Sequence, residues 1–198
     1  MEGRKIEIDI MSNPKDFVEQ WSPHYDYPNS NLYNDNIKTG LSNKDSFIEL
    51  FRWKNGIRNI ADKKMKVIEG FWEKVNELNK LKTGDDWKKF DWKRFEDAFE
   101  PHKSSCIWKM FLLHIMDAKN YPIFDVHVYR FHYFLTTGTI KEIPSYQKSK
   151  YEYYRDNYIG WFNNMKVVHE LDPKEMDKAF FTFGKILKPL KGVPINIS

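Results

Sequence analysis

Apolar residues recur at helical spacing along most of the chain. Between 57 and 78 they fall three or four positions apart, which places them on one face of a long helix. The same pattern predicts helices over 14–21, 43–54, 91–100, 107–116, 125–137, 145–169 and 173–187. We therefore expect an all-α fold.

Polar and conformationally special residues mark the ends of these helices. Ser104 or Ser105 precedes the apolar run 107–116, and Asp125 precedes the next amphipathic stretch. Gly138 suits a helix end because it tolerates positive φ. Pro173 suits the first turn of the last helix because that turn leaves its backbone N–H groups unpaired.

Two N-terminal segments depart from helical periodicity. Residues 5–10 alternate polar and apolar positions, which predicts a short, peripheral β-strand. Residues 22–41 are rich in Pro, Asn, Ser and Tyr without periodicity, which predicts a long ordered loop. At 198 residues the chain is expected to form one domain, 1–198.

Composition narrows the class of protein. The chain is 41% hydrophobic and 17% aromatic, enough to fill a core although 30% of its residues are charged. Its single cysteine, Cys106, excludes an intramolecular disulfide and a four-cysteine cluster, and its apolar neighbours predict a buried thiol. No apolar run is long enough to cross a bilayer and the N-terminus is charged, so we expect a cytoplasmic location without a membrane partner. The net charge of +4 is compatible with a nucleic-acid partner.

Common cofactor signatures are absent from the sequence. The six histidines form no i,i+4 pair and no HExxH motif, so no metal site is predicted. Neither a GxxxxGK[ST] loop nor a GxGxxG motif occurs. We expect no cofactor.

Tyr121–Arg130 (YPIFDVHVYR) is the most informative stretch. Its aspartate, Asp125, stands between an apolar approach and an amphipathic helix, where the helix dipole and free backbone N–H groups favour a carboxylate. Such a carboxylate suits stabilising a positive centre or orienting a water molecule. The simpler interpretation is a helix cap, for which aspartate is among the commonest residues.

The pattern Pro-x-x-Asp-x-His-Val-x-Arg resembles the segment around the essential aspartate of helix-hairpin-helix (HhH-GPD) DNA glycosylases. An earlier segment, Phe47–Gly56, resembles the apolar helix of that family whose last polar residue enters the duplex where the target base leaves. Asn55 occupies that position, with Lys54 and Gly56 beside it. Between the two segments lies Phe99–Trp108, at the place of the family's hairpin.

The resemblance implies a two-lobed helical domain with a central cleft, one lobe about 42–116 and the other combining 1–41 with 117–198. It implies a monomeric DNA N-glycosylase that flips and excises a damaged or modified base from double-stranded DNA, in repair or in anti-phage defence. Asp125 would stabilise the oxocarbenium-like sugar and orient water. No iron–sulfur cluster is implied, since the chain lacks the four cysteines that would bind one.

The hairpin departs from the family pattern because it has no glycine and contains Pro101. The resemblance then assigns DNA contacts to His102, Lys103, Ser104 and Ser105. In bifunctional members a lysine after the hairpin attacks the sugar. Lys103 is the nearest candidate, although its spacing to Asp125 is longer than usual and phosphate binding is the more ordinary role.

Four residues are candidates for a pocket that holds the flipped base: Trp53, Trp108, Tyr121 and His127. Core packing is the alternative for each aromatic residue, and a backbone hydrogen bond is the alternative for the histidine.

Two other functions remain open at this stage. The chain could be a non-catalytic nucleic-acid-binding module, which would bind DNA in a salt-dependent way without releasing a base. It could also be a helical interaction protein of a defence system, with Asp125 acting only as a cap. The sequence names neither the base nor the oligomeric state.

Overall fold

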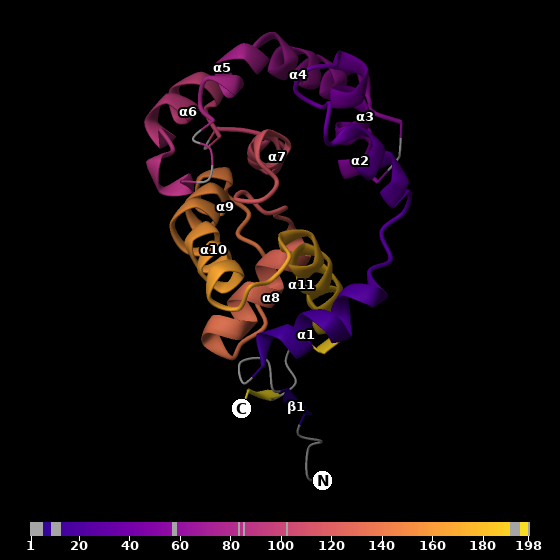
Figure 1. The fold of residues 1–198 in the computed structure, drawn as a ribbon, viewed down its shortest axis with the longest axis vertical. Coiled ribbons are helices and arrows are strands. Elements are labelled where there is room, and N and C mark those ends of the chain that lie inside the picture. Colours follow the sequence, from indigo (N-terminus) through magenta and orange to yellow (C-terminus); the bar gives the residue numbers. More distant parts are fainter. Residues whose placement is uncertain are drawn as a thin grey trace.

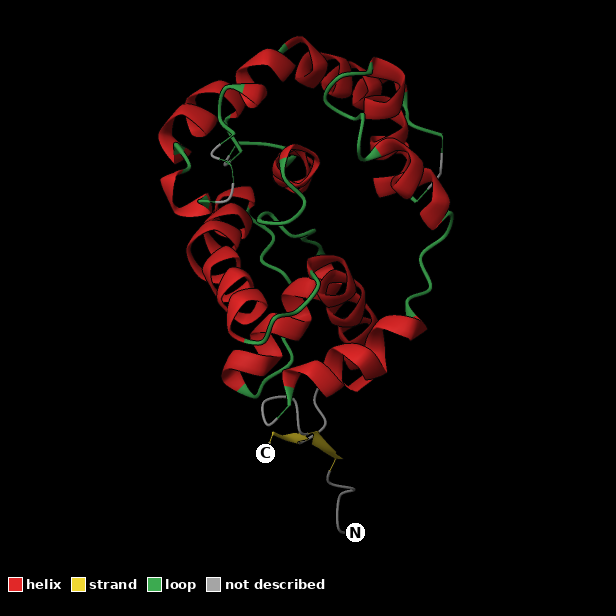
Figure 2. Cartoon of the chain, in the orientation of Figure 1, coloured by secondary structure: helices red, strands yellow, loops and turns green. Residues whose placement is uncertain are grey.

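Helices dominate the computed structural model, which describes residues 6–8, 13–56, 59–82, 84, 86–101, 103–190 and 195–197 (Figures 1 and 2). The α-helices are α1 (Pro14–Trp21), α2 (Ser30–Asn36), α3 (Lys44–Lys54), α4 (Asp62–Glu73), α5 (Val75–Asn79), α6 (Trp92–Phe99), α7 (Cys106–Met116), α8 (Val126–Thr137), α9 (Gln147–Tyr153), α10 (Ile159–Val168) and α11 (Pro173–Leu187). Short 3₁₀ helices occupy Ser22–His24 (η1), Trp87–Lys89 and Lys188–Leu190, and a π-helical turn joins α9 to α10 over Tyr154–Tyr158. The prediction of an all-α fold is confirmed.

Several predicted helix ends are confirmed. The Asn43 side chain caps α3 by accepting from the N–H of Ser46. Gly138 ends α8 with φ of 69°, and α11 has the predicted bounds, beginning at Pro173. Because caps and stops act within one helical turn, they can be read from local sequence.

Three local predictions are wrong. Residues 22–41 are not a loop throughout, because they contain η1 and α2. α2 is short and polar, and packing against α3 supplies the stability that its own sequence lacks. The helix expected over 57–78 is divided at Lys74 into α4 and α5, and the helix expected over 145–169 contains the π-helical turn.

The predicted N-terminal strand is present as β1 (Ile6–Ile8). It pairs in parallel with β2 (Ile195–Ile197), a strand that the sequence pattern did not predict.

The helices surround α7, which lies in the upper half of the view in Figure 1, inside the arc of helices there. All residues of α7 except Ile107 and Trp108 are buried, as expected for a helix that is apolar on nearly every side. α2 to α6 form an arc on one side of α7, and α1 and α8 to α11 gather on the other (Figure 1). Among the described residues, α8 and α11 share the most extensive contact of any helix pair, and α1 packs against α11 as well.

Candidate functional site

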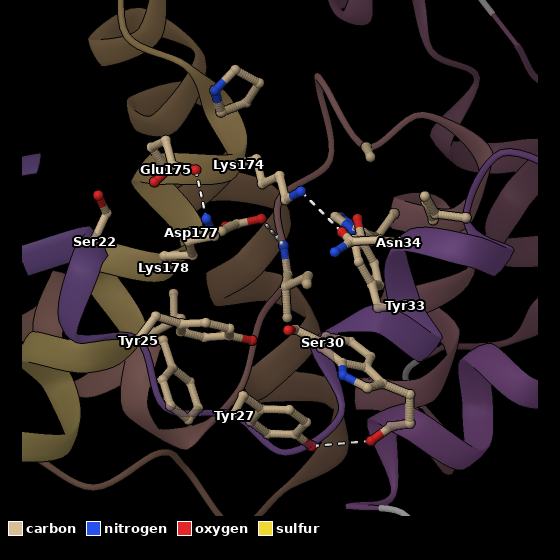
Figure 3. Close-up of a pocket in the computed structure, with 18 of the residues that line it drawn as sticks. Ser22, Tyr25, Tyr27, Ser30, Tyr33, Asn34, Lys174, Glu175, Asp177 and Lys178 are labelled. Atoms are coloured by element: carbon tan, nitrogen blue, oxygen red, sulfur yellow. Dashed lines mark hydrogen bonds and ion pairs between the residues drawn. The ribbon is translucent and has the colours of Figure 1, made fainter.

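A cavity of about 670 Å³ is lined by segments far apart in the sequence (Figure 3). They are η1 and the extended residues after it, α2, the C-terminal end of α3, the end of α7 with the turn after it, the start of α8, and the N-terminal half of α11. This volume lies within the range of small-ligand sites, roughly 300–1,000 Å³. Asp125 is among the lining residues.

The Asp125 carboxylate serves both the helix and the cavity. Its Oδ1 accepts from the backbone N–H groups of His127 at 2.8 Å and Val128 at 3.0 Å, which caps α8. Its Oδ2 lies 4.0 Å from Nζ of Lys54, another lining residue. The cap fixes the direction of the carboxylate while the side chain remains 20% exposed.

Lys54 is the last residue of α3, and its side chain is only 8% exposed. Its ammonium group lies 5.7 Å from the centre of the Phe111 ring and close to Asp125. Burial lowers the pKa of Lys54, while Asp125 and Asp177 act in the opposite direction. A cationic group is thus held beside the candidate catalytic carboxylate.

The backbone that leads into Asp125 is fixed from several helices. Each of residues 120–123 bonds through its backbone to a side chain from another element: Asn120 O to Asn163 Nδ2, Tyr121 O to His114 Nδ1, Pro122 O to Tyr154 OH, and Ile123 N–H to Asp177 Oδ2. Satisfied buried polar groups of this kind define one conformation. Asp125 is therefore presented from a rigid segment.

His114 connects this segment to α2. Its Nδ1 lies 2.8 Å from the carbonyl oxygen of Tyr121, so Nδ1 carries the hydrogen and Nε2 accepts from the Tyr33 hydroxyl at 2.7 Å. Burial lowers the pKa of His114 to about 3, so the ring is neutral at physiological pH. Its role is to position the cavity wall.

Aromatic rings in successive contact form much of the cavity wall. Ring centres are 5.4 Å apart for Tyr25 and Phe181, 5.6 Å for Phe181 and Tyr27, 4.9 Å for Tyr27 and Trp53, and 4.7 Å for Trp53 and Tyr33. The Tyr27 hydroxyl donates to the carbonyl of Trp53 at 3.2 Å, which joins the 25–27 segment to the end of α3. Such walls suit a flat, unsaturated ligand.

Asp177 is a second carboxyl group in the lining. It belongs to α11, one helical turn before Phe181, and is 9% exposed (Figure 3). Oδ2 accepts from the N–H of Ile123 at 3.2 Å, whereas Oδ1 has no hydrogen-bond partner among the described residues. Burial raises the pKa of Asp177 well above its usual value, and the neighbouring Asp125 carboxylate adds to the effect.

The structure brings some of the sequence-predicted residues together at the cavity. Asp125, Lys54 and Trp53 line it. Asn55 and Gly56 form the turn directly after Lys54, where Asn55 Oδ1 accepts from Lys64 Nζ at 3.0 Å and Gly56 has φ of 73°. A Cβ added to Gly56 would meet nothing within 4 Å, so this turn faces open space.

Three predicted pocket residues lie outside the described lining. Trp108 packs against Phe51 and beneath Lys64. Tyr121 is fully buried in the core. His127 contacts Phe181 with ring centres 4.9 Å apart, so it supports the wall from behind.

The turn before α7 has an unusual backbone. Glu100 and Ser105 both adopt positive φ, 46° and 50°, the conformation that glycine adopts most easily. Ser105 stands at the N-cap of α7 without a side-chain hydrogen bond, and the N–H of Cys106 donates instead to Gln147 Oε1 at 3.1 Å. The expected cap by a serine hydroxyl is wrong because this distant glutamine takes its place.

The residues assigned to DNA contact in this turn are at the surface. Lys103 is 62% exposed, pairs with Glu100, and is not among the residues that line the cavity. Ser104 and Ser105 are exposed, whereas His102 lies outside the described residues. Cys106 is buried as predicted, and burial raises the pKa of its thiol to about 11.

Sequence reasoning missed Asp177 and the tyrosines at 25, 27 and 33. A signal for Asp177 exists: it shares the buried face of α11 with Phe180 and Gly184, where an acidic residue is unusual. The tyrosines lie in a segment without periodicity, and nothing local indicates that they reach the end of α3.

Among the described residues, no three or more His, Cys, Asp or Glu side chains are placed to hold a metal ion, and no helix is long and apolar enough to span a membrane. No family model, curated protein or solved structure matches the chain.

Proposed function

We propose that the protein is a DNA N-glycosylase and that the cavity receives a base turned out of the duplex. The observation that carries this proposal is the Asp125 carboxylate, which is fixed by the α8 cap through Oδ1 and has Oδ2 beside Lys54 in an aromatic-walled cavity. A cap alone requires neither a cavity nor a buried lysine.

The charges around the cavity support a polyanionic partner. Besides Lys54, four lysines line it, and three of them are exposed: Lys38, Lys119 and Lys174. Exposed lysines at a cavity can bind phosphate groups and release their counterions. We propose that they contact the DNA backbone while the base enters.

The turn after α3 supplies a group for the space that the base leaves. Asn55 follows Lys54 directly, and Gly56 leaves open space at the turn. We propose that Asn55 enters the duplex from a lobe of about 42–116, and that Asp125 approaches the sugar from a second lobe formed by the rest of the chain. The cavity would then lie in the cleft between the lobes.

The chemistry follows from the carboxylate. The bond between the sugar C1′ and the base nitrogen breaks, and its electron pair leaves with the base. The sugar gains positive charge, which the Asp125 carboxylate stabilises. Water then attacks C1′ and transfers a proton to the Asp125 carboxylate, which leaves an abasic site.

Duplexes that each contain one modified base provide the test. After incubation with the protein, alkaline cleavage reveals abasic sites. We expect strand cleavage for at least one base in the panel. Salt-dependent binding with no cleavage on any member would instead identify a non-catalytic DNA-binding module.

A further inference from the structure

The cavity contains a buried acid that the proposed reaction does not use. Asp177 lines the cavity wall, and no basic side chain of the described residues lies within salt-bridge distance of it. Its Oδ1 makes no hydrogen bond to any described residue. A buried polar group without a partner costs free energy, so its presence needs an explanation. Binding of a ligand would provide one.

The charge state of this acid follows from its surroundings. Burial raises the pKa of Asp177 well above its usual value, which the hydrogen bond from the N–H of Ile123 and the charge of Lys54 only partly oppose. The raised pKa favours the neutral carboxylic acid, which has one O–H to donate. A carboxylate could only accept.

We infer that Asp177 recognises the bound base by donating a hydrogen bond to an acceptor atom on its ring. This inference rests on the proposed function, because it takes the ligand to be a nucleobase. The rings of Tyr25, Tyr27, Trp53 and Phe181 hold the flat faces of the base, and Asp177 reads one edge. The substrate class is a neutral base with a ring acceptor.

The remaining charges exclude a cationic base. Five lysines line the cavity, whereas only Asp125 and Glu175 remain as ionised carboxyl groups when Asp177 is neutral. A positively charged alkylated purine would meet repulsion from these lysines, and it would ionise Asp177 only against the cost of burial. Neutral heteroaromatic rings meet neither obstacle.

Two ring compounds that differ by one acceptor test the inference without DNA. Indole and benzimidazole have the same shape and each has one ring N–H, but only benzimidazole has an acceptor nitrogen. Their affinities for the full chain are measured by saturation-transfer NMR titration at neutral pH, where benzimidazole is uncharged. We expect benzimidazole to bind about tenfold more tightly than indole, the usual consequence of one hydrogen bond to a buried group. The permanent cation 1,3-dimethylbenzimidazolium is expected to bind more weakly than either.

Two variants identify the donor. Asp177→Asn keeps an N–H donor, so the preference for benzimidazole should survive, whereas Asp177→Leu should remove it. Loss of the preference in the Asn variant would show that hydrogen-bond donation at position 177 does not cause it and would overturn the inference. So would equal binding of the two rings to the wild-type protein, or binding of neither.

Thermal unfolding checks that both variants are folded. If Asp177→Leu does not fold, the binding of the two rings to the wild type and to Asp177→Asn still tests the inference. The proposed glycosylase activity is judged separately on the duplex panel. Base release together with equal binding of the two rings would support the proposed function but show that Asp177 does not recognise the base. The expected ring preference without base release would leave a heteroaromatic-binding cavity that is not a glycosylase.

Discussion

The two oxygens of the Asp125 carboxylate have different partners. Oδ1 accepts two backbone N–H groups at the start of α8, and Oδ2 lies 4.0 Å from the ammonium group of Lys54. Capping and chemistry are therefore compatible in one residue. The cap holds the carboxylate in a fixed direction, which is what electrostatic stabilisation of a developing charge requires.

The second carboxyl group, Asp177, should make stability depend on pH. Its pKa is raised in the folded state, so the folded protein keeps a proton that the unfolded chain loses above its usual pKa of 3.8. Stability from this group is full below that value and is lost as pH rises. We expect Asp177→Asn to be increasingly more stable than the wild type as pH rises from acid to neutral.

Urea unfolding of both proteins across this pH range measures the effect. A difference in unfolding free energy that does not change with pH would mean that Asp177 is ionised in the folded protein. Asp172→Asn, at an exposed position on the same helix end, is the control and should show no such increase.

The sequence predicted Asp125 but not Asp177, and the reason is the range of the interactions involved. A helix cap depends on residues two and three positions away, so the pattern around Asp125 was sufficient. The burial of Asp177 and Lys54 depends on the packing of α11 and α3 against distant segments. The local sequence places Asp177 on the apolar face of α11 but does not reveal the segments that cover it, and nothing local reveals the burial of Lys54.

At the scale of elements, the crossing of α8 and α11 sets the position of Asp125. The helices approach at Gly184, where an added Cβ would lie 2.0 Å from the carbonyl oxygen of His127. The carbonyl of Gly184 also accepts from Nη1 of the buried Arg130 at 2.7 Å. Only glycine allows the two helices to approach so closely. The contact is made with His127, two residues after Asp125.

A pair of glycine-to-alanine substitutions tests the crossing. Helix propensity favours alanine at both Gly184 and Gly70 by roughly 1 kcal/mol. At Gly70 on α4 an added Cβ meets nothing within 4 Å, so stability should rise. At Gly184 the clash with the α8 backbone should lower the unfolding free energy by about 1–3 kcal/mol or more.

Chemical unfolding of the two variants gives the comparison. A gain in stability for Gly184→Ala would mean that α8 and α11 do not approach as closely as described. The base-release rate of Gly184→Ala should fall too, because the Asp125 carboxylate is held by the backbone N–H of His127, whose carbonyl meets the added Cβ.

Whether a helix or strand could be predicted from the sequence depends on whether the contacts that stabilise it are local. α11 was predicted with its observed bounds because its apolar face and its proline both lie within its own sequence. α2 was missed because it is held by contacts of Tyr33 with Trp53 and His114. Strand β2 has a partner at the opposite end of the chain, and no local pattern reveals such a pairing.

At the scale of the whole molecule, charge is unevenly placed although the net charge is only +4. The lysines that line the cavity outnumber its ionised carboxyl groups. A duplex that covers the cavity would therefore displace counterions, and its binding should weaken as salt increases.

Replacing three exposed lysines at the cavity tests this arrangement. The triple variant changes Lys38, Lys119 and Lys174 to Gln. Each lost phosphate contact should reduce the slope of log affinity against log salt by about 0.9, measured by fluorescence anisotropy with duplex DNA. Changing Lys88 and Lys89, which are not among the cavity-lining residues, should leave the slope unaltered. Equal slopes for both variants would place the DNA elsewhere.

The central claim is that the Asp125 carboxylate carries out base release. Asp125→Asn keeps the cap, since asparagine caps helices as well as aspartate does, but it removes the charge. Asp172→Asn is the matched control, because Asp172 caps α11 through two backbone N–H groups and is not among the cavity-lining residues.

The most direct measurement is single-turnover base release on a duplex that the wild type processes. We expect Asp125→Asn to be slower by about 100-fold or more while Asp172→Asn keeps the wild-type rate. A folded Asp125→Asn protein that releases the base at the wild-type rate would contradict the account.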